Sequence, residues 1–217
     1  AKEHGVNKLY IHFFSDGRDT SPRSALRYIE NLKEKIGEYE IGEIATIMGR
    51  YYAMDRGRNW NLTTIAYNVL TQARGKRIDN IEDAINRVYN TRTPNGEDMF
   101  DEYIPPLIVG DFQGIRDGDS VIHINYRQDR ASQLSMAFVE DDYPGERWKK
   151  LNIVYCGLTR YYDTFAYNIL EPMNDTGGMD NLLGKVLSEK GLRQIRISET
   201  QKFSHVTSFF NGKTTEP

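Results

Sequence analysis

The chain has 217 residues, of which 39% are hydrophobic and 27% charged, and its formal net charge is −3 at pH 7. This composition is typical of an ordinary globular protein and argues against a disordered chain. It also argues against a nucleic-acid partner, because domains that bind polyanions usually carry a net basic surface.

Cysteine content and hydropathy indicate the cellular compartment in which we expect the protein. Cys156 is the only cysteine and lies in an apolar run, so we interpret it as a core residue of a protein from a reducing compartment. No apolar run approaches the roughly 20 residues that span a bilayer, and the N-terminus does not resemble a signal peptide. We therefore expect a cytoplasmic protein without a membrane partner. Residues 1–5 are typical of a helix end capped by Gly5, which indicates a piece of a longer protein.

The first half of the chain alternates strand and helix patterns. β-branched and aromatic residues over positions 6–14 predict a buried strand. Ser21 as N-cap and Pro22 at the first helical position then begin a helix, which Gly37 ends. The next predicted elements are a strand over 43–48, a helix over 60–71, a basic connector over 73–79, a helix over 80–89 and a polar loop over 91–98.

The second half continues this alternation. Its predicted elements are strands over 105–109 and 120–125, a helix over 129–139, a strand over 151–158, a helix over 181–190 that ends at Gly191, and short strands over 194–197 and 205–210 around a turn or helix at 198–202. Residues 159–178 show no clean period. The order of elements predicts the α/β class, as a layered α/β/α sandwich around a mostly parallel or mixed sheet.

Arginines recur just after three of the predicted strands. They are Arg18 after the first strand, Arg50 and Arg56 after the second, and Arg127 with Arg130 after the strand over 120–125. Ligands of open α/β sheets bind outside the carboxyl ends of the strands, and arginine recognises phosphate and carboxylate through bidentate hydrogen bonds. The sequence therefore predicts a site for a small phosphorylated or carboxylated metabolite.

Each arginine segment also has a purely structural interpretation. Residues 16–20 are typical of a tight turn with a surface ion pair, although an ionised Asp19 beside Arg18 could accept a proton from a substrate hydroxyl. Residues 49–56 carry two arginines that could bracket a small ligand, or they form a solvated loop whose Tyr51 and Tyr52 pack on the sheet with Trp60. Both can hold at once, because aromatic packing would immobilise the loop for binding. Arg127 and Arg130 share one face at a helix start, where cations oppose the macrodipole, and this favours a bridging anion.

The histidines and the known catalytic motifs add little. His4, His12, His123 and His205 have no metal-ligand spacing, and we expect hydrogen-bonded structural roles for His12 and His123. No zinc-protease motif, phosphate-cradling glycine loop or nucleophile elbow is present. The chain therefore offers groups that bind an anion, without an evident nucleophile or metal cage.

Four segments, in order, resemble cofactor-independent (2,3-bisphosphoglycerate-independent) phosphoglycerate mutase. They are residues 12–20 (HFFSDGRDT), 49–56 (GRYYAMDR), 126–130 (YRQDR) and 199–207 (ETQKFSHVT). The resemblance implies an isomerase of glycolysis and gluconeogenesis that interconverts 3-phosphoglycerate and 2-phosphoglycerate through a phosphoserine. Such enzymes combine a phosphatase-like domain, which carries the serine and two manganese or magnesium ions, with an inserted domain that holds the glycerate.

By this resemblance, residues 1–198 are the inserted substrate-binding domain, and residues 199–217 return toward the missing phosphatase-like domain. The family's substrate contacts carry over to Arg18, Asp19, Arg50, Arg56, Arg127, Arg130 and Lys202. Asp19 would shuttle a proton on the glycerate hydroxyls, and Lys202 would reach the phosphoryl group. We expect no cofactor or metal in this chain, no turnover by the chain alone, and a monomer for the full-length enzyme.

Three alternatives remain at this stage. Lys202 taken alone is typical of a solvated surface lysine. The chain could be a stand-alone regulatory module that binds a phosphorylated metabolite. Nucleic-acid binding through the arginines with Tyr51, Tyr52 and Trp60 is a further possibility, which the acidic net charge disfavours.

Overall fold

The computed structural model describes residues 1–162, 164–170, 181–203 and 205–212. The strands are β1 (Tyr10–Ser15), β2 (Glu43–Gly49), β3 (Lys76–Ile78), β4 (Leu107–Val109), β5 (Ser120–His123), β6 (Val154–Gly157) and β7 (Asn168–Ile169). The α-helices are α1 (Ala25–Tyr39), α2 (Arg50–Ala53), α3 (Trp60–Gln72), α4 (Ile81–Tyr89), α5 (Gln128–Val139) and α6 (Leu183–Glu189). Short 3-10 turns cover Lys2–His4, Asp101–Tyr103 and Thr200–Lys202, and a π-helical turn covers His205–Phe209.

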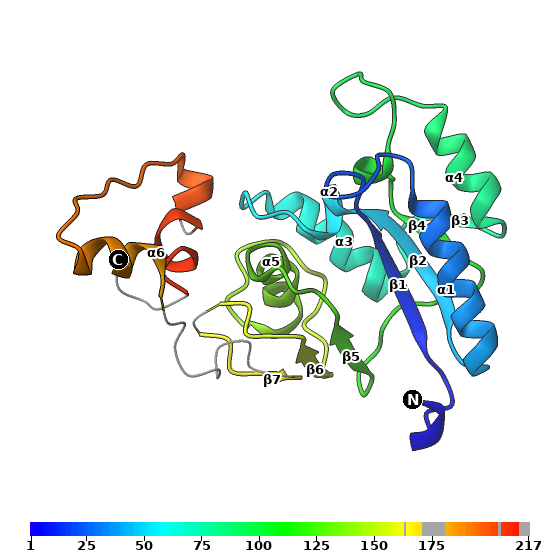
Figure 1. Ribbon diagram of the computed structural model, residues 1–217. Helices are drawn as coiled ribbons and strands as arrows, with labels where there is room; N and C mark the ends of the chain where they lie inside the picture. Colours follow the sequence, from blue (N-terminus) through cyan, green and yellow to red (C-terminus); the bar gives the residue numbers. More distant parts are fainter. Residues whose placement is uncertain (163, 171–180, 204, 213–217) are drawn as a thin grey trace.

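The strands of the described residues form two sheets rather than one. The first sheet is mixed, with the order β1-β2-β4-β3, and the second is a parallel sheet with the order β5-β6-β7. Helices α1 and α4 cover one face of the first sheet, whereas α3 and α5 pack together between the two sheets (Figure 1). The predicted α/β class is confirmed, but its strands divide into a mixed and a parallel sheet.

Strand β2 explains why two hydrophobic cores form. Its residues alternate between them, with Ile44 and Ile47 in the core under α1 and α4, and Ala45 and Met48 in the core against α3 and α5. A strand buried on both faces is a nearly continuous apolar run, as this segment is. The prediction of a strand over 43–48 is confirmed, and the strand ends at the position where Arg50 begins α2.

Helix α1 begins at Ala25, so the prediction of Ser21 as its N-cap is wrong. The carboxylate of Asp101 accepts hydrogen bonds from the backbone N–H of Ser24 at 2.7 Å and of Ala25 at 2.8 Å. This carboxylate supplies the cap from another part of the chain. The helix also continues through Gly37, and it ends at Glu40 in the left-handed conformation, with φ of 50°.

We expect Asp101→Ala to lower the free energy of unfolding by about 2–4 kcal/mol, as the sum of a lost cap and an unsatisfied buried hydroxyl. Asp101 is 1% exposed, and it also accepts a hydrogen bond from the Tyr89 hydroxyl at 2.5 Å. Urea denaturation measures the effect. Asp98→Ala is the control, because Asp98 is exposed and should change stability by no more than about 0.5 kcal/mol. Equal stability of the two variants would contradict the assignment.

Two short strands were not predicted. Strand β3 lies in the expected basic connector, where two of its three residues are exposed at a sheet edge, so no hydrophobic pattern marks it. Strand β7 has two residues and lies in the segment 159–178, which showed no period; residues 163 and 171–178 of that segment lie outside the described residues. Charged side chains at such edges are common because they discourage pairing with another chain.

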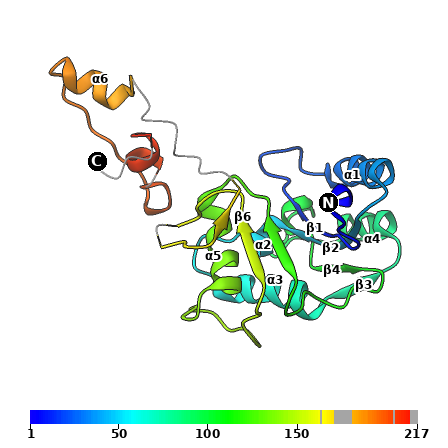
Figure 2. The same ribbon diagram turned by 90° about the horizontal axis from the view of Figure 1, so that it is seen from below.

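The C-terminal segment differs from the prediction. Residues 194–197 form no strand, and the predicted strand over 205–210 is instead the π-helical turn His205–Phe209. Ile195 and Ile197 are 85% and 84% exposed, and no strand of the described residues pairs with 194–197. Helix α6 and its continuation lie apart from the two sheets (Figure 2). The helix before Gly191 is confirmed, with the glycine at φ of 69°.

His123 is buried and His12 is half-buried, in accord with their structural interpretation. The His12 Nδ1 atom lies 2.8 Å from the Thr46 hydroxyl, and the His123 Nδ1 atom lies 2.9 Å from the Tyr155 hydroxyl. Burial lowers the pKa of each histidine from 6.5 to about 4. Both side chains are therefore neutral in the folded protein at neutral pH.

This burial predicts a pH-dependent stability. Between pH 6.5 and about 4 the unfolded chain takes up a proton at each histidine and the folded chain does not. Stability should therefore be full above this window and should fall through it, by at most about 1.4 kcal/mol per pH unit for each histidine. Urea unfolding at several pH values measures the slope. His12→Gln should reduce the slope, and an unchanged slope would contradict the prediction.

None of the helices in the described part of the chain combines the length and the apolar character needed to cross a membrane.

Candidate anion-binding site

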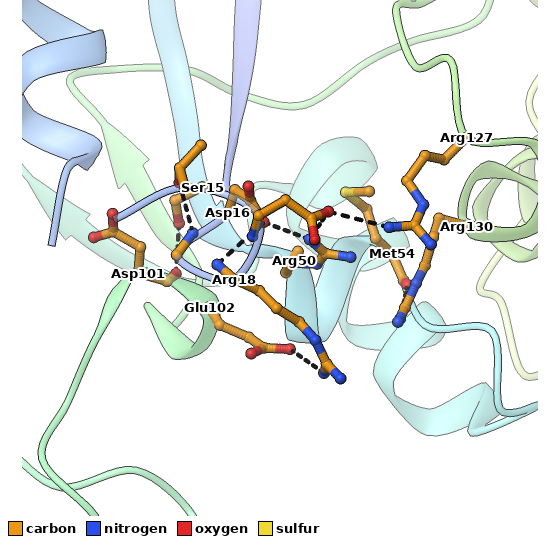
Figure 3. Close-up of polar contacts among 12 residues, drawn as sticks. Ser15, Asp16, Arg18, Arg50, Met54, Asp101, Glu102, Arg127 and Arg130 are labelled. Atoms are coloured by element: carbon orange, nitrogen blue, oxygen red, sulfur yellow. Dashed lines mark hydrogen bonds and ion pairs between the residues drawn. The ribbon is translucent and has the colours of Figure 1, made fainter. Parts of the chain in front are cut away.

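The loops after β1 and β2 approach the Asp101–Tyr103 turn very closely. A Cβ atom at Gly49 would lie 2.1 Å from the carbonyl oxygen of Glu102, and one at Gly17 would lie 2.7 Å from Cβ of Asp101. Gly17 also has φ of 69°, which disfavours any other residue. The Ser15 hydroxyl donates to the Asp101 carbonyl at 2.7 Å (Figure 3). Both strand ends are thereby fixed on one turn.

Arg50 is held by the two carboxylates of the first loop. Its side chain is 3% exposed; it forms an ion pair with Asp16, and its Nη1 atom lies 2.9 Å from Oδ2 of Asp19. Hydrogen bonding from Arg50 lowers the pKa of Asp19, an effect that burial opposes and the charges of Arg50 and Arg127 strengthen. Burial raises the pKa of Asp16, but the Arg50 hydrogen bond and two backbone N–H groups outweigh it. Both carboxylates are therefore ionised at neutral pH.

Arg127 links the segment after β5, in the second sheet, to the segment after β1, in the first sheet. Its Nη1 atom lies 3.1 Å from the same Oδ2 atom of Asp19, so one carboxylate oxygen bridges Arg50 and Arg127. Asp129 makes a second bridge, with Oδ2 2.5 Å from Nη1 of Arg56 and Oδ1 3.6 Å from Nε of Arg127. The segments after β1, β2 and β5 therefore meet, as their positions at strand ends predicted.

Arg130 has no ion pair within the described part of the chain. Its Nη1 atom donates to the Met54 carbonyl at 3.0 Å (Figure 3), and its Nε atom is buried without an acceptor, as are Nε and Nη2 of Arg50. Burial, followed by the charges of Arg56, Arg50 and Arg127, lowers the pKa of Arg130 to about 10. Crowded, partly buried cations with unused donors are the arrangement that an anion would stabilise.

Arg18 and Lys202 lie at the margin of this group. Arg18 is 60% exposed, with Nη1 3.4 Å from Oε1 of Glu102. Lys202 is 61% exposed and pairs with Glu199 at 2.8 Å, and the described residues show no contact between Lys202 and the arginines. Lys202 lowers the pKa of Glu199, and the charge of Arg56 adds to this effect.

The arginine cluster is defined as Arg18, Arg50, Arg56, Arg127 and Arg130. Sequence reasoning named all five, but it assigned no role to the carboxylates that hold them, Asp16, Glu102 and Asp129. Asp16 and Asp129 stand inside the recognised segments, where alternation of Arg and Asp was a visible signal. Glu102 had no such signal, because it contacts Arg18 across 84 positions of the chain.

The loop that carries Arg56 is held by two side chains that the sequence did not indicate. Asp55 accepts hydrogen bonds from the backbone N–H of Gly57 at 3.1 Å and of Asn59 at 2.9 Å. Gln133 of α5 donates to Asp55 at 2.8 Å and accepts from the N–H of Arg58 at 2.8 Å. Tyr51 also packs on Tyr103, with ring centroids 4.9 Å apart. The loop is therefore held by polar contacts as well as by aromatic packing.

The cluster is an open surface rather than an enclosed chamber. Asp19 is 59% exposed and Arg127 is 37% exposed. A cavity of about 300 Å³ lies elsewhere, at the amino ends of β1 and β2, and is lined by residues that include Tyr10, Glu43 and Phe112. The arginines converge on a face that is open to solvent at Asp19 and Arg127.

The fold and the cluster define an α/β protein with a cationic site at the carboxyl ends of its strands. A sequence model of the family described as BPG-independent PGAM N-terminus matches residues 1–163. The chain belongs to this family, which confirms the resemblance seen in the sequence.

Known relatives agree. The chain is 42% identical over 219 residues to 2,3-bisphosphoglycerate-independent phosphoglycerate mutase 1 of Methanosarcina acetivorans, covering 98% of this chain and 41% of that protein. It is 41% identical over 226 residues to the corresponding mutase of Moorella thermoacetica, covering 100% of this chain and 42% of that protein. The chain therefore spans about two-fifths of the length of these relatives.

A solved structure shares the fold. It is a phosphoglycerate mutase of Leishmania mexicana at low cobalt concentration, with a TM-score of 0.80 and 26% sequence identity. The similarity covers 99% of this chain and 40% of that one. It therefore includes the C-terminal segment as well as both sheets.

Proposed function

We propose that this chain is the substrate-binding part of a phosphoglycerate mutase that interconverts 3-phosphoglycerate and 2-phosphoglycerate. One observation carries the proposal. Arg130 has no ion pair in the described residues, although three other arginines surround it. In addition, buried N–H groups of Arg50 and Arg130 lack acceptors. A ligand with a carboxylate and a phosphate would neutralise these cations and accept hydrogen bonds from Arg18 and Arg127, which are exposed. Family membership favours phosphoglycerate among such ligands.

In this proposal the arginines hold the acid and Asp19 handles a proton. Asp19 is ionised because Arg50 lowers its pKa, so it can accept a proton from a glycerate hydroxyl. A ligand anion that pairs with Arg50 and Arg127 would release the Asp19 carboxylate from both, and release would raise its basicity. Binding itself would then prepare the base for the transfer.

The phosphoryl transfer requires groups from elsewhere. Within the described residues no group of three or more His, Cys, Asp or Glu side chains could hold a metal ion, so the residues present do not fit a two-metal site. We assign the serine nucleophile and the manganese or magnesium ions to the rest of a longer polypeptide. Residues 199–217 would lead toward that part, and Lys202 would reach the phosphoryl group there. The proposal includes a cytoplasmic, monomeric full-length enzyme.

Calorimetric titration of the 217-residue chain with 3-phosphoglycerate tests the proposal. We expect binding by the natural chain and a loss of at least about 10-fold in affinity for Arg127→Ala, because one charge-assisted contact is removed. Arg92→Ala is the control, since Arg92 is an exposed arginine paired with Asp98 away from the cluster. Absence of binding, or equal binding by both variants, would refute the assignment.

A further inference from the structure

A buried chain of polar side chains lies behind the first turn of α5. Its members come from three elements: His123 ends β5, Tyr155 lies in β6 and Ser135 in α5, with exposures of 8%, 3% and 0%. The Tyr155 hydroxyl lies 2.9 Å from Nδ1 of His123 and 2.8 Å from Oγ of Ser135. Ser135 in turn donates to the Ala131 carbonyl at 2.8 Å.

The direction of these hydrogen bonds follows from the number of protons. A hydroxyl donates once, and Ser135 uses its proton on the Ala131 carbonyl, which can only accept. With Ser135 donating to Ala131, the consistent assignment has Tyr155 donating to Ser135 and His123 donating from Nδ1 to Tyr155. In this assignment His123 is the neutral tautomer with its proton on Nδ1. Its Nε2 atom is then a buried lone pair, for which the described residues provide no donor.

Both ends of the chain lead to the arginines. At one end Ala131 directly follows Arg130. At the other end, the His123 carbonyl accepts from the N–H of Asn125 at 3.1 Å, and the Asn125 side chain accepts from the N–H of Arg127 at 2.9 Å. The turn that carries Arg127 and Arg130 is therefore tied to His123 from both sides.

The same histidine also contacts the first sheet. The edge of its ring faces Phe14 of β1, with centroids 6.3 Å apart, and Phe14 stands four positions before Arg18. The Tyr161 hydroxyl donates to the His123 carbonyl at 2.6 Å. His123 is thus the point where β1, β5 and β6 meet behind the site.

We propose that His123, Tyr155 and Ser135 form a positioning network for anion recognition, which sets the first turn of α5 so that Arg127 and Arg130 meet Arg50 and Arg56. The inference rests on the proposed function, because it assigns a role within that site. The network touches no ligand itself. Its effect is to fix the spacing between guanidinium groups that come from two different sheets.

Tyr155→Phe tests the network with the least change of shape. It removes only the hydroxyl, and the ring can keep its packing on Phe138 and Phe165. We expect the affinity of the 217-residue chain for 3-phosphoglycerate to fall about fivefold or more, as a lost buried hydrogen bond displaces the turn. In NMR spectra the Nε–H signals of Arg127 and Arg130 should shift, while that of Arg92 stays in place.

Tyr67→Phe is the matched control. Tyr67 is another buried tyrosine of the same core, and its hydroxyl donates to the Lys149 carbonyl at 2.6 Å, away from the arginines. It should lose similar stability and keep its affinity within about twofold. Equal affinities of the two phenylalanine variants, or unmoved arginine signals in Tyr155→Phe, would overturn the network.

Ser135→Ala provides a second variant if Tyr155→Phe does not fold. It removes the link to Ala131 and places a good helix former in α5, and we expect about a threefold loss of affinity. Natural affinity in this variant would also overturn the inference. The proposed function fails separately, if the natural chain does not bind 3-phosphoglycerate or if Arg127→Ala binds as tightly.

Discussion

Arg130→Met is expected to stabilise the fold and to weaken anion binding at the same time. Arg130 is partly buried among cations, and burial with their charges lowers its pKa to about 10. Replacing an unpaired buried charge by an apolar side chain of similar length should raise the free energy of unfolding by about 1–2 kcal/mol, after the lost hydrogen bond to Met54 is counted. Affinity for 3-phosphoglycerate should fall by about 100-fold, because a desolvated charge contact is removed.

Urea denaturation without ligand and calorimetric titration measure the two effects separately. Arg92→Met is the control and should change neither, since Arg92 is 67% exposed. A variant that lost stability and binding together would show that Arg130 supports the fold rather than the ligand. A higher free energy of unfolding together with a lower affinity would identify the cluster as a place where the protein gives up stability for binding.

Asp19→Asn is expected to separate binding from turnover. The carboxylate of Asp19 lies between Arg50 and Arg127 and so competes with any incoming anion for both. An amide is neutral, so the 217-residue chain should bind inorganic phosphate about three- to fivefold more tightly, as expected for exposed ion pairs. If the full-length polypeptide is the proposed mutase, its turnover should fall by about 10²- to 10⁴-fold, because a proton acceptor is lost.

Phosphate titration of the chain and steady-state kinetics of the full-length polypeptide check the two halves of this prediction. Asp98→Asn is the control for the charge change, because Asp98 is exposed and pairs with Arg92 rather than with the cluster. The prediction applies above pH 3.8, where the lowered pKa keeps Asp19 ionised in the natural chain. Weaker phosphate binding by Asp19→Asn would mean that the carboxylate arranges the arginines rather than competing with their ligand.

Local patterns predicted most of the secondary structure and failed where distant contacts decide it. Helices α3, α4 and α5 were predicted because their apolar residues recur at helical spacing. The start of α1 was misplaced because its cap comes from Asp101, 77 positions from Ser24. The two strands predicted near the C-terminus do not form, since a strand needs a partner and residues 194–197 have none in the described chain.

In the site, too, features set by the local sequence could be predicted and features set by distant contacts could not. The arginines could be predicted because they follow strands, and the carboxyl ends of strands are where α/β proteins bind ligands. The ion pairs between the segments could not be predicted, because a pair such as Asp19 with Arg127 joins residues 108 positions apart. The proposed positioning network could not be predicted either, because His123, Ser135 and Tyr155 come from three elements that only the fold brings together.

The open side of the arginine cluster has a kinetic consequence. Asp19 and Arg18 are 59% and 60% exposed, so a small anion can approach directly from solvent without waiting for a loop to open. Association should be fast and should slow markedly with added salt, because screening acts strongly on exposed charges. Dissociation of the anion is equally unobstructed, so the lifetime of the complex should be short. A companion surface that closes over the arginines would lengthen residence time far more than it would change the rate of arrival.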